Sequence, residues 1–134
     1  MSLKVERLEN ELLKSNTYLI THEKSNSCYI VDPGDYNPIK SRIKGIKVLG
    51  VFLTHSHIDH IYGLDMLYHD LVLDPPCLYF SEQCLKGLLD SKVNGSYYMS
   101  QPYVHNPRKY EIIYEGTILS LFHDLYQLEV LETP

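Results

Sequence analysis

Three histidines and one aspartate lie close together near the middle of the chain, at His55, His57, Asp59 and His60. Neutral imidazoles and carboxylates are ligands of zinc, iron and manganese, so this stretch could begin a site for two metal ions. It follows an apolar run, 48–53, that reads as a buried strand. An unpaired group of charged side chains directly after a buried strand would be costly to hold, which favours metal binding over a polar loop.

The spacing of these residues has a geometric consequence. If the chain stays extended through His55 and His57, their side chains point to the same face, because side chains alternate along a strand. If the chain then turns into a helix, Asp59 and His60 can reach the same point from its first turn. The spacing therefore predicts that all four side chains converge.

Length and composition restrict the other functions. The chain has 134 residues, which fits a single domain over 1–134. A net charge of −5 argues against nucleic-acid binding, and no apolar stretch is long enough to span a membrane. Cys28, Cys77 and Cys84 show no C-x-x-C spacing and are predicted to be small hydrophobic residues. With no signal peptide expected, this predicts a cytoplasmic protein.

Hydrophobic periodicity predicts the elements that lead to the cluster. Strands at 16–21 and 28–31 should form a hairpin, which the turn residues D-P-G-D at 32–35 then end. An amphipathic helical stretch is expected at 38–47. Residues 48–53 are too uniformly apolar for a half-exposed strand and predict a central one.

The second half of the chain continues this alternation. A helix is expected at 61–70, a strand at 77–80 and a helix that opens at Ser81. An irregular loop, 96–109, should lead into a β-meander that begins at Tyr110. The order of elements predicts an α/β (α+β) fold, with a mixed β-sheet and helices packed on it.

The sequence resembles the metallo-β-lactamase superfamily. Residues 54–60, T-H-S-H-I-D-H, match the family signature T-H-x-H-x-D-H, with a small residue following at Gly63. Matches to the family's N-terminal hairpin, its D-P-G turn and the stretch before its next metal motif lie at 15–20, 29–35, 115–121 and 128–134. The resemblance implies the N-terminal half of an αββα sandwich, with helices on one face of a mixed sheet.

The resemblance also implies a role for each residue of the cluster. His55 and His57 would bind one metal ion, and Asp59 and His60 a second, with Asp59 also acting as the catalytic residue that manages a proton. Asp32 would orient the metal ligands without binding a metal ion itself, although the residue type alone equally fits a plain turn aspartate. Zinc is the implied metal, as one or two ions, with iron or manganese as alternatives.

The implied activity is that of a metal-dependent hydrolase. Such proteins hold a hydroxide between the ions, which here would attack a thioester, ester or amide, with a glyoxalase II-type thioester as the first expectation. The family's later ligands, two histidines and a bridging aspartate, are not found in this chain. Two ligands per ion fall short of the usual three, so the resemblance does not imply activity of this chain alone. If active, the chain would take a small-molecule substrate. The remaining histidines are expected to be surface or capping residues: His22, His69, His105 and His123.

Two other functions fit the same residues, namely a non-catalytic dimeric metal-binding domain and an iron-dependent oxidoreductase that resembles the persulfide dioxygenases. A half-fold would also leave one face of its sheet without a partner. Exposed apolar surface of that size normally marks an interface, so a homodimer is predicted in which a second copy covers this face. The residues expected on or near it are Leu19, Val31, Val51, Leu53, Leu128 and Val130.

Overall fold

The computed structural model describes residues 3–99 and 101–132, and its centre is a six-stranded mixed sheet with the strand order β1-β2-β3-β4-β5-β6. β1, β2 and β3 are antiparallel, whereas β4, β5 and β6 continue parallel to β3. The strands are β1 (Leu3–Glu9), β2 (Asn16–His22), β3 (Ser27–Val31), β4 (Lys47–Phe52), β5 (Cys77–Phe80) and β6 (Tyr110–Ile112). The predicted hairpin and the predicted central strand are confirmed, and β1 is followed by a 3-10 turn at Leu12–Lys14.

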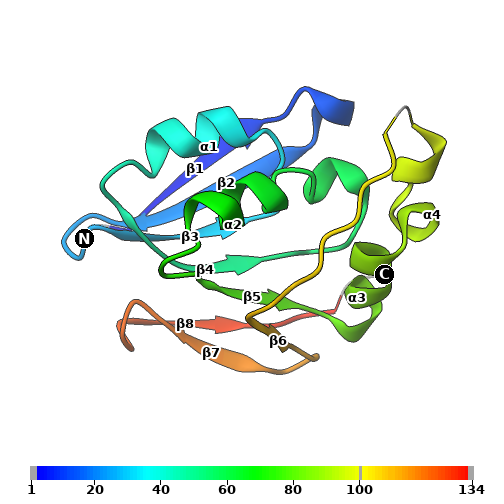
Figure 1. The fold of residues 1–134 in the computed structure, drawn as a ribbon. Helices are drawn as coiled ribbons and strands as arrows, with labels where there is room; N and C mark the ends of the chain where they lie inside the picture. The colour runs from blue at the N-terminus through cyan, green and yellow to red at the C-terminus, as the bar shows by residue number, and fades with distance from the viewer. Residues whose placement is uncertain (1–2, 100, 133–134) are drawn as a thin grey trace.

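Helices cover one face of this sheet, as predicted, with α1 and α2 lying above it in Figure 1. They are α1 (Tyr36–Arg42), α2 (Leu64–Asp70) and α3 (Glu82–Leu89), followed by the short α4 (Ser91–Asn94) and a 3-10 turn at Ser96–Tyr98. Their inward residues, such as Ile39, Leu64 and Leu88, are fully buried against the sheet. Each such side chain contributes about 1.5–3 kcal/mol through burial.

The helix predicted at 38–47 is shorter than expected and begins earlier. It starts at Tyr36, which Pro38 permits because the first turn of a helix needs no backbone N–H donor there. It ends at Arg42, and Gly45 then adopts a left-handed conformation with a φ of 75°. Ile43 and Ile46 still pack towards the core, so the hydrophobic spacing was real although the helix does not extend through it.

The parallel arrangement sets the position of the site. Because β3, β4 and β5 run in the same direction, their carboxyl ends lie at one edge of the sheet. The turn 32–35, the loop 53–63 and the start of α3 therefore meet at this edge. In open α/β sheets, ligands usually bind in the crevice outside the carboxyl ends of the strands.

The opposite face of the sheet carries a separate hairpin, β7 (Ile118–Leu121) and β8 (Tyr126–Glu129), which lies below the sheet in Figure 1. The predicted β-meander is therefore wrong, because β6 joins the main sheet by parallel pairing and β7–β8 forms a second sheet. A second core, built on Tyr29, Phe52, Leu121 and Phe122, fills the space between the two sheets.

This arrangement corrects the sequence-based choice of residues for the partnerless face. Leu19, Val51 and Leu53 belong to the core between sheet and helices, whereas Val31 and Leu128 pack in the second core. The reason is that β4 is apolar on both faces, so its sequence does not show which residues face the helices.

The structure also bears on two predictions made from composition, the role of the cysteines and the absence of a membrane span. Cys28 and Cys84 pack in the main core as predicted, and burial raises the pKa of each thiol to about 12, so both are protonated and unreactive. All three cysteines are free. Among the residues that the structure describes, none of the helices has both the length and the apolar character required to cross a bilayer.

Candidate metal centre

The loop after β4 has the shape that the spacing predicted, with one difference. His57 is extended, with φ of −60° and ψ of 142°. Ile58–His60 then forms a 3-10 turn, and α2 begins only at Leu64, so Asp59 and His60 extend from a tight turn that precedes the helix. Ile58 and Ile61 are buried and anchor this turn in the core.

The four predicted side chains are neighbours, but only His55 and His60 belong to the group whose candidate ligand atoms all lie within 4.8 Å of one another. The ring centroid of His55 is 4.0 Å from that of His60 and 4.9 Å from that of His57. Nε2 of His60 lies 3.3 Å from Oδ2 of Asp59. His57 is exposed, His55 and His60 are half-buried, and Asp59 is buried. The cluster thus opens to solvent on the side of His57 and is backed by protein behind Asp59.

Asp32 joins the cluster from the turn after β3. Candidate ligand atoms of Asp32, His55 and His60 lie within 4.8 Å of one another. However, the oxygens of Asp32 already accept three hydrogen bonds: Oδ1 accepts one from the backbone N–H of Thr54 at 2.7 Å, and Oδ2 accepts one from Thr54 Oγ1 at 2.5 Å and one from His60 Nδ1 at 2.9 Å. Asp32 is therefore better placed to orient His60 than to bind a metal ion itself.

The hydrogen bond to Asp32 has a consequence for the proton on His60. A proton held on Nδ1 by the carboxylate leaves the lone pair of Nε2 free for a metal ion. The same hydrogen bond raises the pKa of His60, and the negative charges of Asp32 and Asp59 act in the same direction, against the effect of burial. Burial, followed by the charge of His60, lowers the pKa of His55, which favours the neutral imidazole that binds metal.

Close backbone approaches hold the loop on two sides. Gly63 donates its N–H to the carbonyl of Pro33 at 3.0 Å, and a Cβ at Gly63 would overlap the carbonyl of Gly34. On the other side, α3 presents Gly87, where a Cβ would overlap the side chain of Ser56. The loop between the histidines can therefore lie against both the D-P-G turn and α3 only because these positions carry no side chain.

The structure also shows residues that reading the sequence did not single out. Asn10, Ser15 and Thr17 are buried beneath the loop and hydrogen-bond to one another and to the backbone of the site. Ser15 and Thr17 appeared only as part of the hairpin that resembles the family. The local sequence carried little signal for them, because Asn10 and Ser15 lie outside the strands and β2 holds other polar residues besides Thr17.

Two of the remaining histidines do not lie at the surface, although His22 accepts the backbone N–H of Ser25 at 3.3 Å, as a capping residue would. His22 and His105 are buried, not at the surface. The ring of His22 packs 5.4 Å from that of Phe122, and Nδ1 of His105 lies 2.6 Å from Oδ1 of Asp65. Their burial depends on contacts with distant segments, which the local sequence does not show. His69 and His123 are exposed, as predicted.

Comparisons with known proteins agree with this fold. The family model of the metallo-beta-lactamase superfamily matches residues 11–71. Hydroxyacylglutathione hydrolase of Blochmanniella pennsylvanica is 28% identical over 90 residues, which cover 66% of this chain and 32% of that protein. A probable metallo-hydrolase of Streptococcus pyogenes serotype M6 is 31% identical over 84 residues, which cover 60% of this chain and 34% of that protein.

Solved structures show the same fold. The B3 metallo-beta-lactamase BLEG-1 superposes with a TM-score of 0.83 at 21% identity, covering 98% of this chain and 62% of that one. The metallo-beta-lactamase GOB-18 from Elizabethkingia meningoseptica gives a TM-score of 0.66 at 18% identity, covering 89% of this chain and 45% of that one. The sheet, its one-sided helices and the residues at its carboxyl edge thus define an α/β protein of the metallo-β-lactamase fold.

The chain belongs to the metallo-β-lactamase superfamily, and its curated relatives include hydroxyacylglutathione hydrolases. It spans about one third of the length of the two curated relatives described above. The fold class expected from the sequence is confirmed.

Proposed function

We propose that this chain carries part of the active site of a metal-dependent hydrolase of the glyoxalase II type, with a small-molecule thioester as substrate. The observation that carries the proposal is the convergence of His55, His57, Asp59 and His60 at the carboxyl edge of the sheet. Its support from relatives is that several similar proteins are hydroxyacylglutathione hydrolases.

The donor set fits a metal ion. Imidazoles and a carboxylate converge, the half-buried His55 is held towards the neutral form, and the tautomer of His60 is set by Asp32. These ligand types suit zinc, which we propose as the metal, and also iron and manganese. His55 and His57 would hold one ion, and Asp59 and His60 a second.

The metal and the residues of the site would have separate roles in the reaction. When bound, the metal would polarise the carbonyl of the substrate and lower the pKa of a water molecule towards neutrality. Asp32 keeps the proton of His60 on Nδ1 and so fixes the ring in the orientation required of a ligand. The carboxylate of Asp59, buried beside His60, is positioned to take up a proton.

The proposal can be tested by metal analysis together with a thioester assay. We expect the purified chain to bind at least one ion of zinc, iron or manganese and to release thiol from an S-acyl glutathione when loaded. Chelation and the substitution His55→Ala should abolish both, whereas the exposed His69→Ala should change neither. Bound metal without turnover would favour the non-catalytic metal-binding domain. Bound iron with oxygen consumption on a persulfide would favour the oxidoreductase.

We also propose that the chain forms a homodimer through the part of the sheet that the β7–β8 hairpin leaves open. Leu3, Val5 and Tyr18 are 40%, 61% and 36% exposed. Val5 pairs with Ile20, which faces the hairpin side, so these three side chains share that side of β1 and β2. Exposed apolar side chains of this kind favour association, and Arg7, which pairs with Tyr18, adds a positive charge on the same side.

Light scattering after size exclusion should therefore give a dimer at micromolar concentration. The substitution Val5→Asp should shift the protein to a monomer. Leu73→Asp should leave it dimeric, because Leu73 is 99% exposed and lies outside β1 and β2. A monomer for the unmodified chain would contradict the proposal.

The free cysteines further support a reducing, cytoplasmic setting as part of the proposed function.

A further inference from the structure

We propose that Asn10 is a positioning residue for the metal centre, because its buried side-chain amide joins the backbone of Asp32 to the backbone of Asp59. This inference rests on the metal-binding function proposed above. Asn10 lies at the end of β1, outside the metal signature, and is 1% exposed. It touches neither a predicted ligand side chain nor the solvent, so its effect on the site is exerted through two hydroxyl groups.

The amide of Asn10 forms a fork. Its Nδ2 donates one hydrogen bond to Oγ of Ser15 at 3.1 Å and one to Oγ1 of Thr17 at 3.0 Å. An amide nitrogen carries two hydrogens, so both are used. Its Oδ1 accepts a hydrogen bond from the backbone N–H of Asp35 at 2.8 Å, which fixes the orientation of the amide.

Each hydroxyl then donates its single hydrogen to one side of the site. Ser15 Oγ donates to the carbonyl of Asp59 at 2.6 Å. Thr17 Oγ1 donates to the carbonyl of Asp32 at 2.7 Å and also accepts the N–H of Gly34 at 3.1 Å. Both hydroxyls accept from Asn10 and donate onward. Thr17 Oγ1 also lies 3.4 Å from Oδ1 of Asn10, but its hydrogen is directed to the carbonyl of Asp32, which is much closer at 2.7 Å.

The backbone of Asp32 needs this support. Its φ of 53° lies in the left-handed region, and it precedes Pro33, a position that favours an extended backbone. Such a conformation persists only where the surrounding structure holds it. Two hydrogen bonds do so here, from the N–H of Asp32 to the carbonyl of Phe52 at 2.9 Å and from Thr17 to the carbonyl of Asp32.

The orientation of the Asp32 carboxylate depends on that backbone conformation. If the fork is lost, Asp32 can relax towards the extended region, and its Oδ2 moves away from His60 Nδ1. The other arm fixes the 3-10 turn that carries Asp59 and His60. Asn10 therefore sets the placement of the Asp32–His60 pair relative to Asp59, and with it the affinity for metal.

The test is a cobalt(II) titration of the full chain, monitored by the visible absorption of the bound ion. Asn10→Asp keeps the shape of the side chain but replaces both donors by an acceptor. We expect its affinity for cobalt to fall about 10- to 100-fold, as it does when groups that support metal ligands are removed, and the absorption bands to change. Ser15→Ala and Thr17→Val each remove one arm and should cause a smaller change in the same direction.

The control is Phe122→Leu, which lowers stability from the opposite face of the sheet and should leave the cobalt affinity and spectrum unchanged. If Asn10→Asp lowers stability but binds cobalt like the unmodified chain, Asn10 has a structural role only and the inference is overturned. If Asn10→Asp does not fold, unchanged binding in both Ser15→Ala and Thr17→Val overturns it instead. Absence of cobalt binding by the unmodified chain would refute the proposed metal centre itself.

Discussion

Asp32→Asn should lower the affinity for zinc about 10- to 100-fold, although the substitution changes only one atom of a side chain that we do not place among the ligands. The Asp32 carboxylate accepts from Thr54 N, Thr54 Oγ1 and His60 Nδ1. An amide can keep the first of these bonds through its oxygen. Its NH2 group then faces His60 Nδ1 and requires an acceptor there, so the proton moves to Nε2 and blocks the nitrogen that would bind metal.

The same substitution should destabilise the metal-free protein. The Asp32 side chain is 5% exposed, and hydrogen bonds to a charged group are worth about 1.5–3 kcal/mol each when buried. Because the pKa of His60 is raised, the charged pair stabilises the fold at a pH below the usual histidine value of 6.5, and this contribution is lost as the pH rises through the folded-state pKa. In Asp32→Asn this component of the pH dependence should disappear.

Zinc competition, urea unfolding at two pH values and nitrogen NMR of the His60 ring measure these effects. The matched control is Asp35→Asn, in the same turn, because Asp35 accepts from the Tyr62 hydroxyl and the Glu11 N–H and touches no histidine. It should keep the zinc affinity. An unchanged zinc affinity and an unchanged His60 tautomer in Asp32→Asn would show that Asp32 does not orient the ring.

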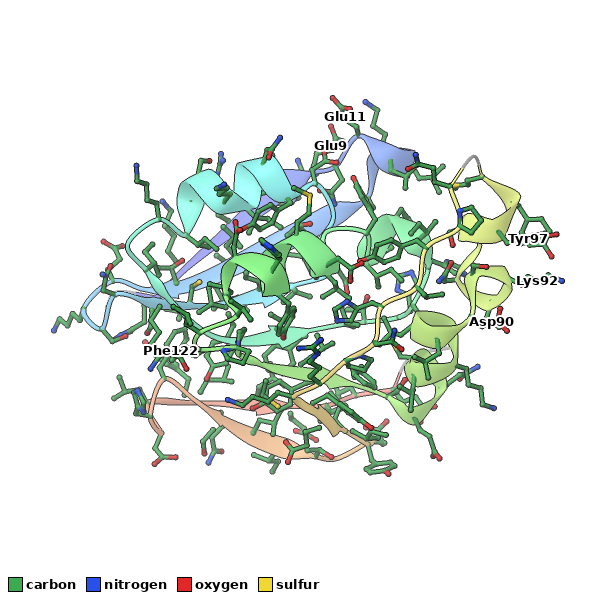
Figure 2. The ribbon with its side chains drawn as sticks, in the orientation of Figure 1. Glu9, Glu11, Asp90, Lys92, Tyr97 and Phe122 are labelled. Atoms are coloured by element: carbon green, nitrogen blue, oxygen red, sulfur yellow. The ribbon has the colours of Figure 1, made fainter. Side chains whose placement is uncertain are left out.

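Phe122→Ala should lower the free energy of unfolding by about 3–5 kcal/mol, the usual cost of removing a large buried aromatic side chain. Phe122 is 1% exposed, and its ring packs 5.0 Å from that of Tyr29 and 5.4 Å from that of His22. Figure 2 shows it at the turn of the β7–β8 hairpin, on the side of the main sheet. It is the anchor that holds this hairpin against the sheet.

The turn itself opposes the hairpin. Phe122, His123 and Asp124 have φ values of 53°, 55° and 72°, and each such left-handed residue costs roughly 1 kcal/mol or more. Without the buried ring, this strain has little to offset it. Hydrogen exchange in 118–129 should therefore accelerate more than elsewhere in the chain. Zinc affinity should be retained, because the metal centre lies at the carboxyl ends of β3, β4 and β5 and not beneath the hairpin.

Urea unfolding and hydrogen exchange measured by mass spectrometry test this prediction. The control is Leu125→Ala, in the same turn but 61% exposed, which should cost less than about 1 kcal/mol. A loss below about 1 kcal/mol in Phe122→Ala, with unchanged exchange in the hairpin, would contradict the anchoring role.

Local sequence determined much of this protein. The spacing from His55 to His60 placed four donor side chains within six residues, and the D-P-G turn and the uniformly apolar β4 were equally local features. Patterns of this kind depend on side-chain periodicity and turn chemistry, which act over a few residues. They were sufficient to predict the helices on one face of a mixed sheet and the proximity of His55 to His60.

Only the tertiary structure showed how the cluster is supported. His60 and Asp32 are 28 residues apart, and Ser15 and Asp59 are 44 apart, so these bonds depend on the register of the strands and not on local pattern. The same holds for the buried His22 and for the face on which β7–β8 packs. The sequence thus determined which atoms could bind a metal. The tertiary structure decided their orientation, because a hydrogen bond between distant residues forms only after the sheet has brought them together.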